Sequence, residues 1–187
     1  MPVRQGFVRL PIVIAAVMAL GACANMDRGR SPYSQASLPD AVKVPAGHVV
    51  AMETVGAGEI TYECRVKTGM AGQFEWVFVG PDAKLVDRKG MQIGRYFGPP
   101  ATWENKDGSK VTGAQAAVAP AANMNDIPVQ LVKANPAMGS GAMQGVSHIQ
   151  RVATRGGIAP SAACGAATLG QKQLVKYQAD YIFWRAS

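Results

Sequence analysis

The sequence predicts an all-β domain, a single antiparallel β-sandwich or barrel of about eight to ten short strands, with little helix outside the N-terminal segment. Apolar residues alternate with polar residues along several segments of the chain. The 187 residues include 21 glycines and 12 prolines, a content typical of a chain with many turns. After residue 23, no segment has a long apolar repeat with the 3.6-residue period of a helix.

The clearest predicted strand covers residues 59–67, where apolar and polar side chains alternate. Ile60, Tyr62, Cys64 and Val66 share one face of an extended segment, and charged or hydroxyl-bearing side chains share the other. This pattern indicates a strand with one buried face, and it places Cys64 in the core.

The middle of the chain contains shorter signals. Residues 73–79 are rich in aromatic and β-branched side chains, and residues 80–83 after them predict a turn. Residues 107–109 predict a tight hairpin turn. Pro128, near the start of the apolar segment 127–134, is typical of an edge strand.

Two further strands are expected at residues 146–154 and 172–185. The last is strongly patterned, and we expect it to pair in the middle of the sheet. The side chains on its apolar face are Val175, Tyr177, Ala179, Tyr181 and Phe183.

Composition narrows the class of protein. Apolar residues make up 48% and charged residues 17% of the chain, which excludes a disordered chain and a multispan membrane protein. The formal net charge is +7, but the charges are scattered without a run of one sign. We therefore expect no nucleic-acid partner.

The N-terminus has the features of a secretion signal. Residues 1–22 contain two arginines followed by an apolar stretch too short to span a membrane. Leu20-Gly21-Ala22-Cys23 resembles the bacterial lipobox, in which the peptidase cuts before a cysteine whose thiol carries a diacylglycerol. The alternative is an ordinary secretory signal. The lipobox reading predicts a protein of the cell envelope, attached to the membrane through Cys23. Ala24 after the cysteine resembles a signal for the outer membrane, with the protein facing the periplasm.

The predicted cleavage before Cys23 sets the first domain boundary. Residues 23–41 are polar, contain proline and lack periodicity, so we expect a flexible tether from the lipid. The folded domain is expected to cover residues 42–187.

Two cysteines remain besides Cys23. Cys64 and Cys164 are 100 residues apart, and in an oxidising compartment a disulfide between them is expected. Closing such a loop stabilises a fold by about 4.7 kcal/mol in the chain-entropy model. A reactive thiol or metal pair is the alternative.

Several segments together resemble one family, the domain of unknown function 3455 found in secreted bacterial and fungal proteins. The resemblance covers residues 42–185, and no single motif in it is specific. The segments that carry it are VPAGH (44–48), ITYECR (60–65), WVFVGPDA (76–83), ATWENKDGS (101–109), IQRVATRGG (149–157) and YQADYIF (177–183).

One segment departs from the family pattern. Where relatives have Gly-x-His-aromatic followed by Gly-Pro-Thr-Trp, residues 94–103 read GRYFGPPATW, without the histidine. The resemblance implies no established activity. Some relatives carry dehydrogenase labels, but the glycines at 56–58 and 139–145 lack the spacing and the following helix of a dinucleotide site. We expect no cofactor.

Candidate catalytic groups are few. His48 and His148 are the two histidines. Ser147 adjoins His148, but neighbours on a regular strand point to opposite faces, so we expect no local Ser–His dyad. Without carboxylates beside both histidines we expect no metal site. Asp82, Asp87, Glu104 and Asp107 could supply a hydrolytic carboxylate pair, although aspartate is also common in turns.

Aromatic residues give the better lead. Trp76, Tyr96, Phe97 and Trp103 lie in or beside loops rich in glycine and proline. A loop tryptophan beside polar groups can stack on a sugar ring or another apolar ligand. The alternatives are that Trp76 belongs to the core and that Trp103 closes one end of the sheet. The candidate ligand-binding residues are Tyr96, Trp103, Glu104 and Asp107.

These observations predict an envelope lipoprotein whose domain binds a ligand without catalysis. The ligand expected is a glycan, a small molecule or an envelope protein. One alternative is an envelope hydrolase that uses the loop carboxylates. A structural envelope protein without a pocket is another.

Overall fold

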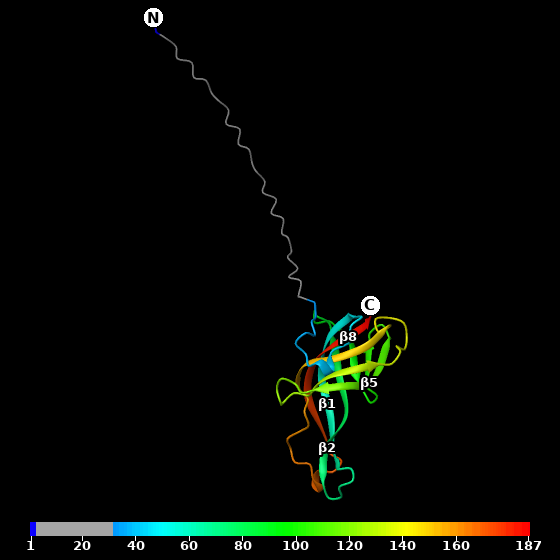
Figure 1. Cartoon of the computed structure of the whole chain (residues 1–187). Helices are drawn as coiled ribbons and strands as arrows, with labels where there is room; N and C mark the ends of the chain where they lie inside the picture. The colour runs from blue at the N-terminus through cyan, green and yellow to red at the C-terminus, as the bar shows by residue number, and fades with distance from the viewer. Residues whose placement is uncertain (3–31) are drawn as a thin grey trace. The chain divides into compact units, whose positions relative to one another are not determined.

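The computed structural model describes residues 1–2 and 32–187 of the chain. Within residues 32–187, eight antiparallel strands follow one another in sequence order around a closed barrel, and pairing of the last strand with the first completes the ring (Figure 1). This confirms the predicted all-β class and selects the barrel. The strands are β1 (His48–Val66), β2 (Phe74–Val86), β3 (Gln92–Phe97), β4 (Thr102–Asn105), β5 (Lys110–Ala119), β6 (Val129–Ala134), β7 (Val146–Gly156) and β8 (Lys172–Ala186).

The barrel interior is filled by one face of each strand. On β8, Tyr177, Ala179, Tyr181 and Phe183 are buried in the main apolar cluster, as the alternation predicts. β8 pairs with both β1 and β7, so its expected central position is confirmed. Met143, from the loop between β6 and β7, is fully buried in the same cluster.

A second apolar cluster lies on the opposite face of the strands. Residues 33–44, which include the short 3-10 helix η1 (Asp40–Val42), pack against Ile182 and Trp184 of β8. The amide of Gln150 on β7 is fully buried and donates to Gln35 Oε1 (2.9 Å) and to the carbonyl oxygen of Val42 (2.7 Å). Residues 33–41, which were expected to belong to the tether, therefore pack against the barrel together with Val42 and Val44.

The expected signal peptide, the lipobox and lipidation at Cys23 fall within or next to residues 3–31, which lie outside the described residues. In the part of the chain that the structure describes, no helix has the length and apolar character needed to cross a bilayer.

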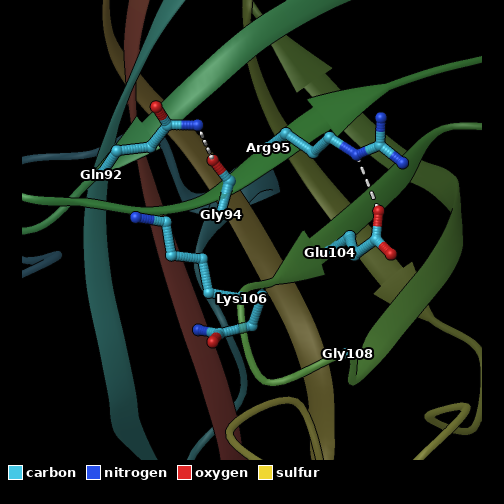
Figure 2. A pocket seen from close by; sticks show the side chains of 7 residues that line it. Gln92, Gly94, Arg95, Glu104, Lys106 and Gly108 are labelled. Atoms are coloured by element: carbon cyan, nitrogen blue, oxygen red, sulfur yellow. Dashed lines mark hydrogen bonds and ion pairs between the residues drawn. The ribbon is translucent and has the colours of Figure 1, made fainter.

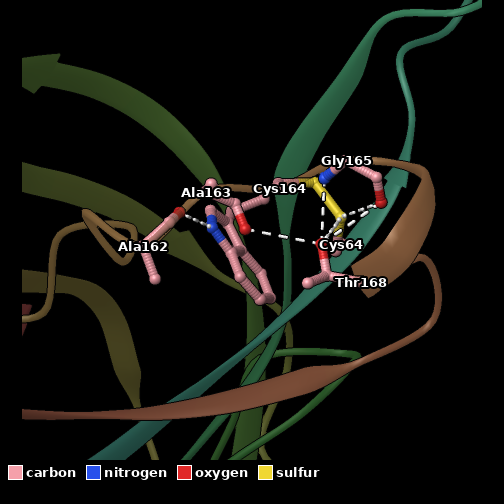
Figure 3. Close-up of a disulfide and its surroundings, with 7 residues drawn as sticks. Cys64, Ala162, Ala163, Cys164, Gly165 and Thr168 are labelled. Atoms are coloured by element: carbon pink, nitrogen blue, oxygen red, sulfur yellow. Dashed lines mark hydrogen bonds between the residues drawn. A yellow bond between two sulfur atoms is a disulfide. The ribbon is translucent and has the colours of Figure 1, made fainter.

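β1 and β2 form a long hairpin that reaches past the other strands in Figure 1, beside the segment that leads into β8. Cys64 in this hairpin is disulfide-bonded to Cys164, with the two Cα atoms 5.5 Å apart. The predicted disulfide is thus confirmed. Trp76 is paired with Cys64 across β1 and β2, and its Nε1 donates to the carbonyl oxygen of Ala162 (2.8 Å). Figure 3 shows Ala162 close to the disulfide. A short 3-10 helix, η2 (Ala166–Thr168), follows.

Two local predictions are wrong. The predicted turn at residues 80–83 lies inside β2, where Pro81 pairs with Ile60 of β1. Pairing of β2 with β3 begins only at Asp82, so Pro81 has a partner strand on one side and its missing N–H is tolerated there. The segment 127–134 is not at an edge, because β6 pairs with both β5 and β7. The hairpin turn at residues 107–109 is confirmed, with Gly108 at φ +88°.

Candidate functional site

Tyr96 and Trp103 are opposite one another on β3 and β4, and both side chains lie in the barrel interior. Their rings are stacked, with centroids 4.6 Å apart and an interplanar angle of 17°. The ring of Tyr181 meets the Trp103 indole edge-on at 5.9 Å between centroids. Such aromatic pairs add about 0.5–1.5 kcal/mol beyond area burial. Two of the predicted ligand-binding residues are therefore in contact.

These two aromatic rings form one wall of a pocket of about 340 Å³. Residues of β5, β6 and β7 form the rest of it, together with one residue of β2 and one of the β3–β4 loop. Arg151 lies two positions after the fully buried Ile149, so its side chain projects to the interior side of β7. The pocket is lined by Phe78, Tyr96, Ala101, Trp103, Gly113, Gln115, Gln130, Val132 and Arg151.

Three polar side chains face the aromatic wall. Gln130 Nε2 donates to Gln115 Oε1 (2.7 Å), which orients both amides. Arg151 donates from Nε (3.2 Å) and Nη2 (3.0 Å) to the carbonyl oxygen of Pro128. The pocket therefore combines an apolar ring surface with amide groups and one fixed positive charge.

The indole N–H of Trp103 stands out among the polar groups. The residue is 1% exposed, and among the described residues its Nε1 atom has no hydrogen-bond partner. A buried donor without an acceptor costs about 1–3 kcal/mol. A ligand oxygen atom that reached this N–H would remove the penalty. Burial also raises the pKa of the neighbouring Tyr96, against the opposing effect of Arg151, so its hydroxyl is neutral and can donate.

Glu104 lies elsewhere. It projects from β4 to the outside of the barrel, where Arg95 Nε donates to its carboxylate at 2.7 Å (Figure 2). The Arg95 guanidinium also lies 4.4 Å from the centroid of the Phe97 ring. A groove of about 290 Å³ runs along this outer surface beside Lys106 and Gln92.

Asp107 organises a turn. Its carboxylate accepts hydrogen bonds from Ser109 Oγ (2.5 Å), from the Ser109 backbone N–H (2.8 Å) and from the Ala142 backbone N–H (2.7 Å). These bonds hold the pKa of Asp107 below its usual range. They also tie the β4–β5 turn to the loop that carries Met143, since Ser109 Oγ accepts from the Met143 N–H (3.1 Å). The four predicted ligand-binding residues therefore belong to three different features.

The carboxylates of the hydrolase alternative are similarly dispersed. Asp82 is exposed on β2 opposite Glu59 of β1, and Lys84 and Lys176 line the same groove of about 510 Å³. Glu104 is paired with Arg95. Asp107 is held in its turn, so the three acids do not line one pocket.

The histidines differ from expectation. Ser147 Oγ lies 3.1 Å from His148 Nδ1, so the prediction that these neighbours point apart is wrong. A register shift of β7 against β8 between Val146 and His148 breaks the regular alternation at this point. Burial, with the nearby His48 and Lys133, lowers the pKa of His148. Among residues 1–2 and 32–187, no group of three or more His, Cys, Asp or Glu side chains is placed to hold a metal ion.

Sequence reasoning did not identify Arg151, Gln115 or Gln130 as site residues. The sequence does contain a signal for Arg151. It lies two positions after the apolar Ile149 in a predicted strand, so the two side chains share a face and a charge falls on the core-facing side. The two glutamines give no comparable signal, since their meeting depends on the pairing of β5 with β6.

Comparison with known proteins places the chain in a family without a described activity. The model of the family described as "Protein of unknown function (DUF3455)" matches residues 45–185. No curated protein and no solved structure matches the chain. Because the match spans most of the barrel domain, the chain belongs to the DUF3455 family of proteins of unknown function.

Proposed function

We propose that this protein is a lipid-anchored binding protein of the bacterial cell envelope, and that its barrel holds a ligand in the pocket beside Tyr96 and Trp103 without transforming it. The observation that carries this proposal is the unpartnered Nε1 atom of Trp103, buried in a residue that lines a pocket. The lipobox-like residues 20–23 support the location.

The chemistry of the pocket defines the ligand class. The stacked Tyr96 and Trp103 rings offer a flat apolar surface for a ring system. Arg151 offers N–H donors and a positive charge to an anionic group, and Gln115 and Gln130 supply amides to neutral hydroxyl or carbonyl groups. A volume of about 340 Å³ is at the small end for ligand sites. We therefore favour a single ring or the end of a chain, such as an acidic sugar unit of an envelope glycan.

The placement of the acids supports binding rather than hydrolysis. Glycoside hydrolysis requires two carboxyl groups on either side of the scissile bond. Glu104 is neutralised by Arg95 on the outer surface, and Asp107 is saturated by donors in its turn. A structural role without a ligand would not require a pocket lined by Arg151 and two amide side chains beside the aromatic pair.

Ligand capture tests the proposal. Native mass spectrometry of the protein isolated from the periplasm should show a bound mass that dissociates on denaturation. If the ligand is lost during isolation, the protein should be titrated with neutral and acidic sugars. Binding of the correct class of sugar should change the tryptophan fluorescence. Trp103→Phe should weaken ligand retention about tenfold or more, because it removes one buried hydrogen bond. Arg151→Gln should weaken it by a similar factor, because it removes one charge-assisted hydrogen bond.

Trp76→Phe is the matched control, because Trp76 also donates through its indole N–H but lies beside the disulfide. It should leave ligand retention unchanged. Equal retention by wild type, Trp103→Phe and Arg151→Gln would contradict the proposal, as would the absence of both a bound mass and any response to the sugars. For the location, Cys23→Ser should remove the lipid mass and release the protein from the membrane fraction.

A further inference from the structure

The two histidines of the chain meet on the outer face of the barrel. His48 begins β1 and is paired with Ala186 of β8, and His148 near the start of β7 is paired with Trp184. β8 thus lies between the two histidine-bearing strands. The ring centroids are 4.8 Å apart and the ring planes are nearly perpendicular, at 89°. The tertiary fold has therefore brought together two imidazoles that are 100 positions apart in sequence.

The surroundings of His48 determine which ring nitrogen carries its proton. Nδ1 lies 3.1 Å from the carbonyl oxygen of Pro45. A carbonyl oxygen only accepts hydrogen bonds, so in the neutral ring Nδ1 carries the hydrogen and donates it. The Nε2 atom of His48 then keeps its lone pair.

The same reasoning applies to His148 through Ser147. When the Ser147 hydroxyl directs its single hydrogen to the carbonyl oxygen of Trp184 (3.3 Å), its oxygen acts as an acceptor toward the imidazole. His148 Nδ1, 3.1 Å from Ser147 Oγ, then carries the proton and donates. Nε2 of His148 also keeps its lone pair.

We propose that His48 and His148 bind one divalent transition-metal ion through their two Nε2 atoms, with water completing the coordination. Two imidazoles on one ion, with metal–nitrogen distances of about 2.0–2.1 Å and an angle of about 90–110° at the metal, place their ring centroids about 4.5–5.2 Å apart. The observed separation agrees with this arrangement. Hydrogen bonds from the far ring nitrogen to backbone or hydroxyl oxygens are also the usual supports of a metal-binding histidine.

The ligand set selects the metal. Neutral imidazole suits Cu²⁺, Ni²⁺ and Zn²⁺, whereas Mg²⁺ and Ca²⁺ require oxygen ligands. Among these ions Cu²⁺ forms the strongest complexes with a given nitrogen site. Lys133 is paired with His148 across β6 and β7, and its positive charge opposes a bound cation. We therefore expect Cu²⁺ to bind most tightly, with lower affinity than at a site with three or four protein ligands.

This site is independent of the proposed ligand pocket. His48 and His148 do not line the pocket beside Trp103, which is formed by residues of β2 to β7 facing the interior. Failure of metal binding would therefore leave the proposed ligand binding untouched, and the reverse also holds.

The experiment is a Cu²⁺ titration of the purified, untagged protein after removal of metals with a chelator. Wild type, His48→Gln, His148→Gln and the double variant should be compared by calorimetry, with thermal unfolding to verify that each is folded. We expect one Cu²⁺ ion in wild type, bound at least tenfold more tightly than in either single variant. The double variant should bind Cu²⁺ at this position at least as weakly as either single variant.

Electron paramagnetic resonance supplies the second readout. Nitrogen hyperfine structure from two imidazoles should be present in wild type and reduced to one nitrogen in each single variant. Lys133→Gln should tighten Cu²⁺ binding severalfold, because it removes the opposing charge. The proposal is overturned if wild type binds Cu²⁺ no more tightly than the double variant. It is also overturned if the two single variants have small, additive effects, which would indicate two separate one-histidine sites.

Discussion

The indole of Trp103 lies flat against the phenol ring of Tyr96 inside the barrel, with centroids 4.6 Å apart, although the sequence separates them by a loop of glycine and prolines. β3 and β4 form a short hairpin around that loop, and its register sets the two residues directly opposite one another. One surface of the pair contacts Tyr181 in the core, and both residues line the pocket that holds Arg151. The same two residues thus contribute to stability and to the candidate site.

Substitutions at Trp103 should separate these contributions. Trp103→Ala removes a fully buried ring and should lower the free energy of unfolding by about 3–5 kcal/mol. Trp103→Phe keeps a ring on Tyr96 and also removes the unpartnered N–H, so its effect on stability should be clearly smaller. Urea unfolding followed by circular dichroism measures both. Equal losses in the two variants would show that the stacked ring is not the main source of stability at this position.

Among the polar residues beside the second apolar cluster, Gln150 should be the one whose substitution lowers stability most. Its amide joins Gln35, the carbonyl oxygen of Val42 and the indole N–H of Trp184 (2.9 Å to Gln150 Oε1), all in a buried region. Gln150→Ala leaves buried donors and acceptors unpaired and should lower the unfolding free energy by about 2–4 kcal/mol. The exposed Gln144→Ala is the control and should change it by less than about 0.5 kcal/mol. A similar result for both glutamines would contradict the inferred network.

The disulfide should stabilise the barrel as well as the long hairpin. Cys64 and Cys164 close a loop of 100 residues. Loss of the bond in the Cys64→Ala, Cys164→Ala double variant should lower the unfolding free energy by about 2–5 kcal/mol. Reduction of the wild-type protein should give a comparable loss, since the same loop is opened. An unfolding curve that is the same with and without reductant would rule out this contribution, provided that intact mass confirms reduction.

Asp107 should make stability depend on pH in the acid range. Its pKa is lower in the folded protein than in the unfolded chain, because Ser109 and the Ala142 N–H hold the charged form. The unfolded chain therefore binds the proton more readily, and stability contributed by Asp107 is complete above the unfolded pKa of about 3.9. This contribution is lost as the pH falls through the lower folded pKa.

Thermal unfolding of wild type and Asp107→Asn between about pH 6 and pH 2 measures this effect. The melting temperature of wild type should exceed that of the variant at the higher pH, and the difference should shrink as the carboxylate becomes protonated. Glu75→Gln, at an exposed position of β2, serves as the control. A difference between wild type and Asp107→Asn that stays constant across this range would exclude the carboxylate charge as its source.

Much of the fold was predictable because strand alternation is a local property. Residues 59–67 and 172–185 showed which side chains face the core, and the structure buries Ile60, Tyr62 and Cys64 as expected. Local patterns were less informative where the turn-forming preference of a residue competed with strand pairing. Gly80 and Pro81 have the composition of a turn, but pairing with β1 keeps them extended.

The candidate site was only partly predictable. Tyr96 and Trp103 stood out as aromatic residues near a loop, and Glu104 and Asp107 were grouped with them because they are close in sequence. Neighbouring positions on a strand project to opposite sides, so Glu104 faces Arg95 on the outside while Trp103 faces the core. Proximity in sequence was therefore a poor guide to membership of the pocket.

The all-β class, the core-facing side of the main strands, the family and the pairing of Cys64 with Cys164 were all predictable from the amino-acid sequence. The tertiary structure alone decided closure of the barrel, the pocket between Trp103 and Arg151, and the meeting of His48 with His148. The physical reason is that strand faces follow from the two-residue repeat of an extended backbone. Contacts between distant segments instead depend on strand register, and one bulge, such as that between Val146 and His148, changes which side chains meet.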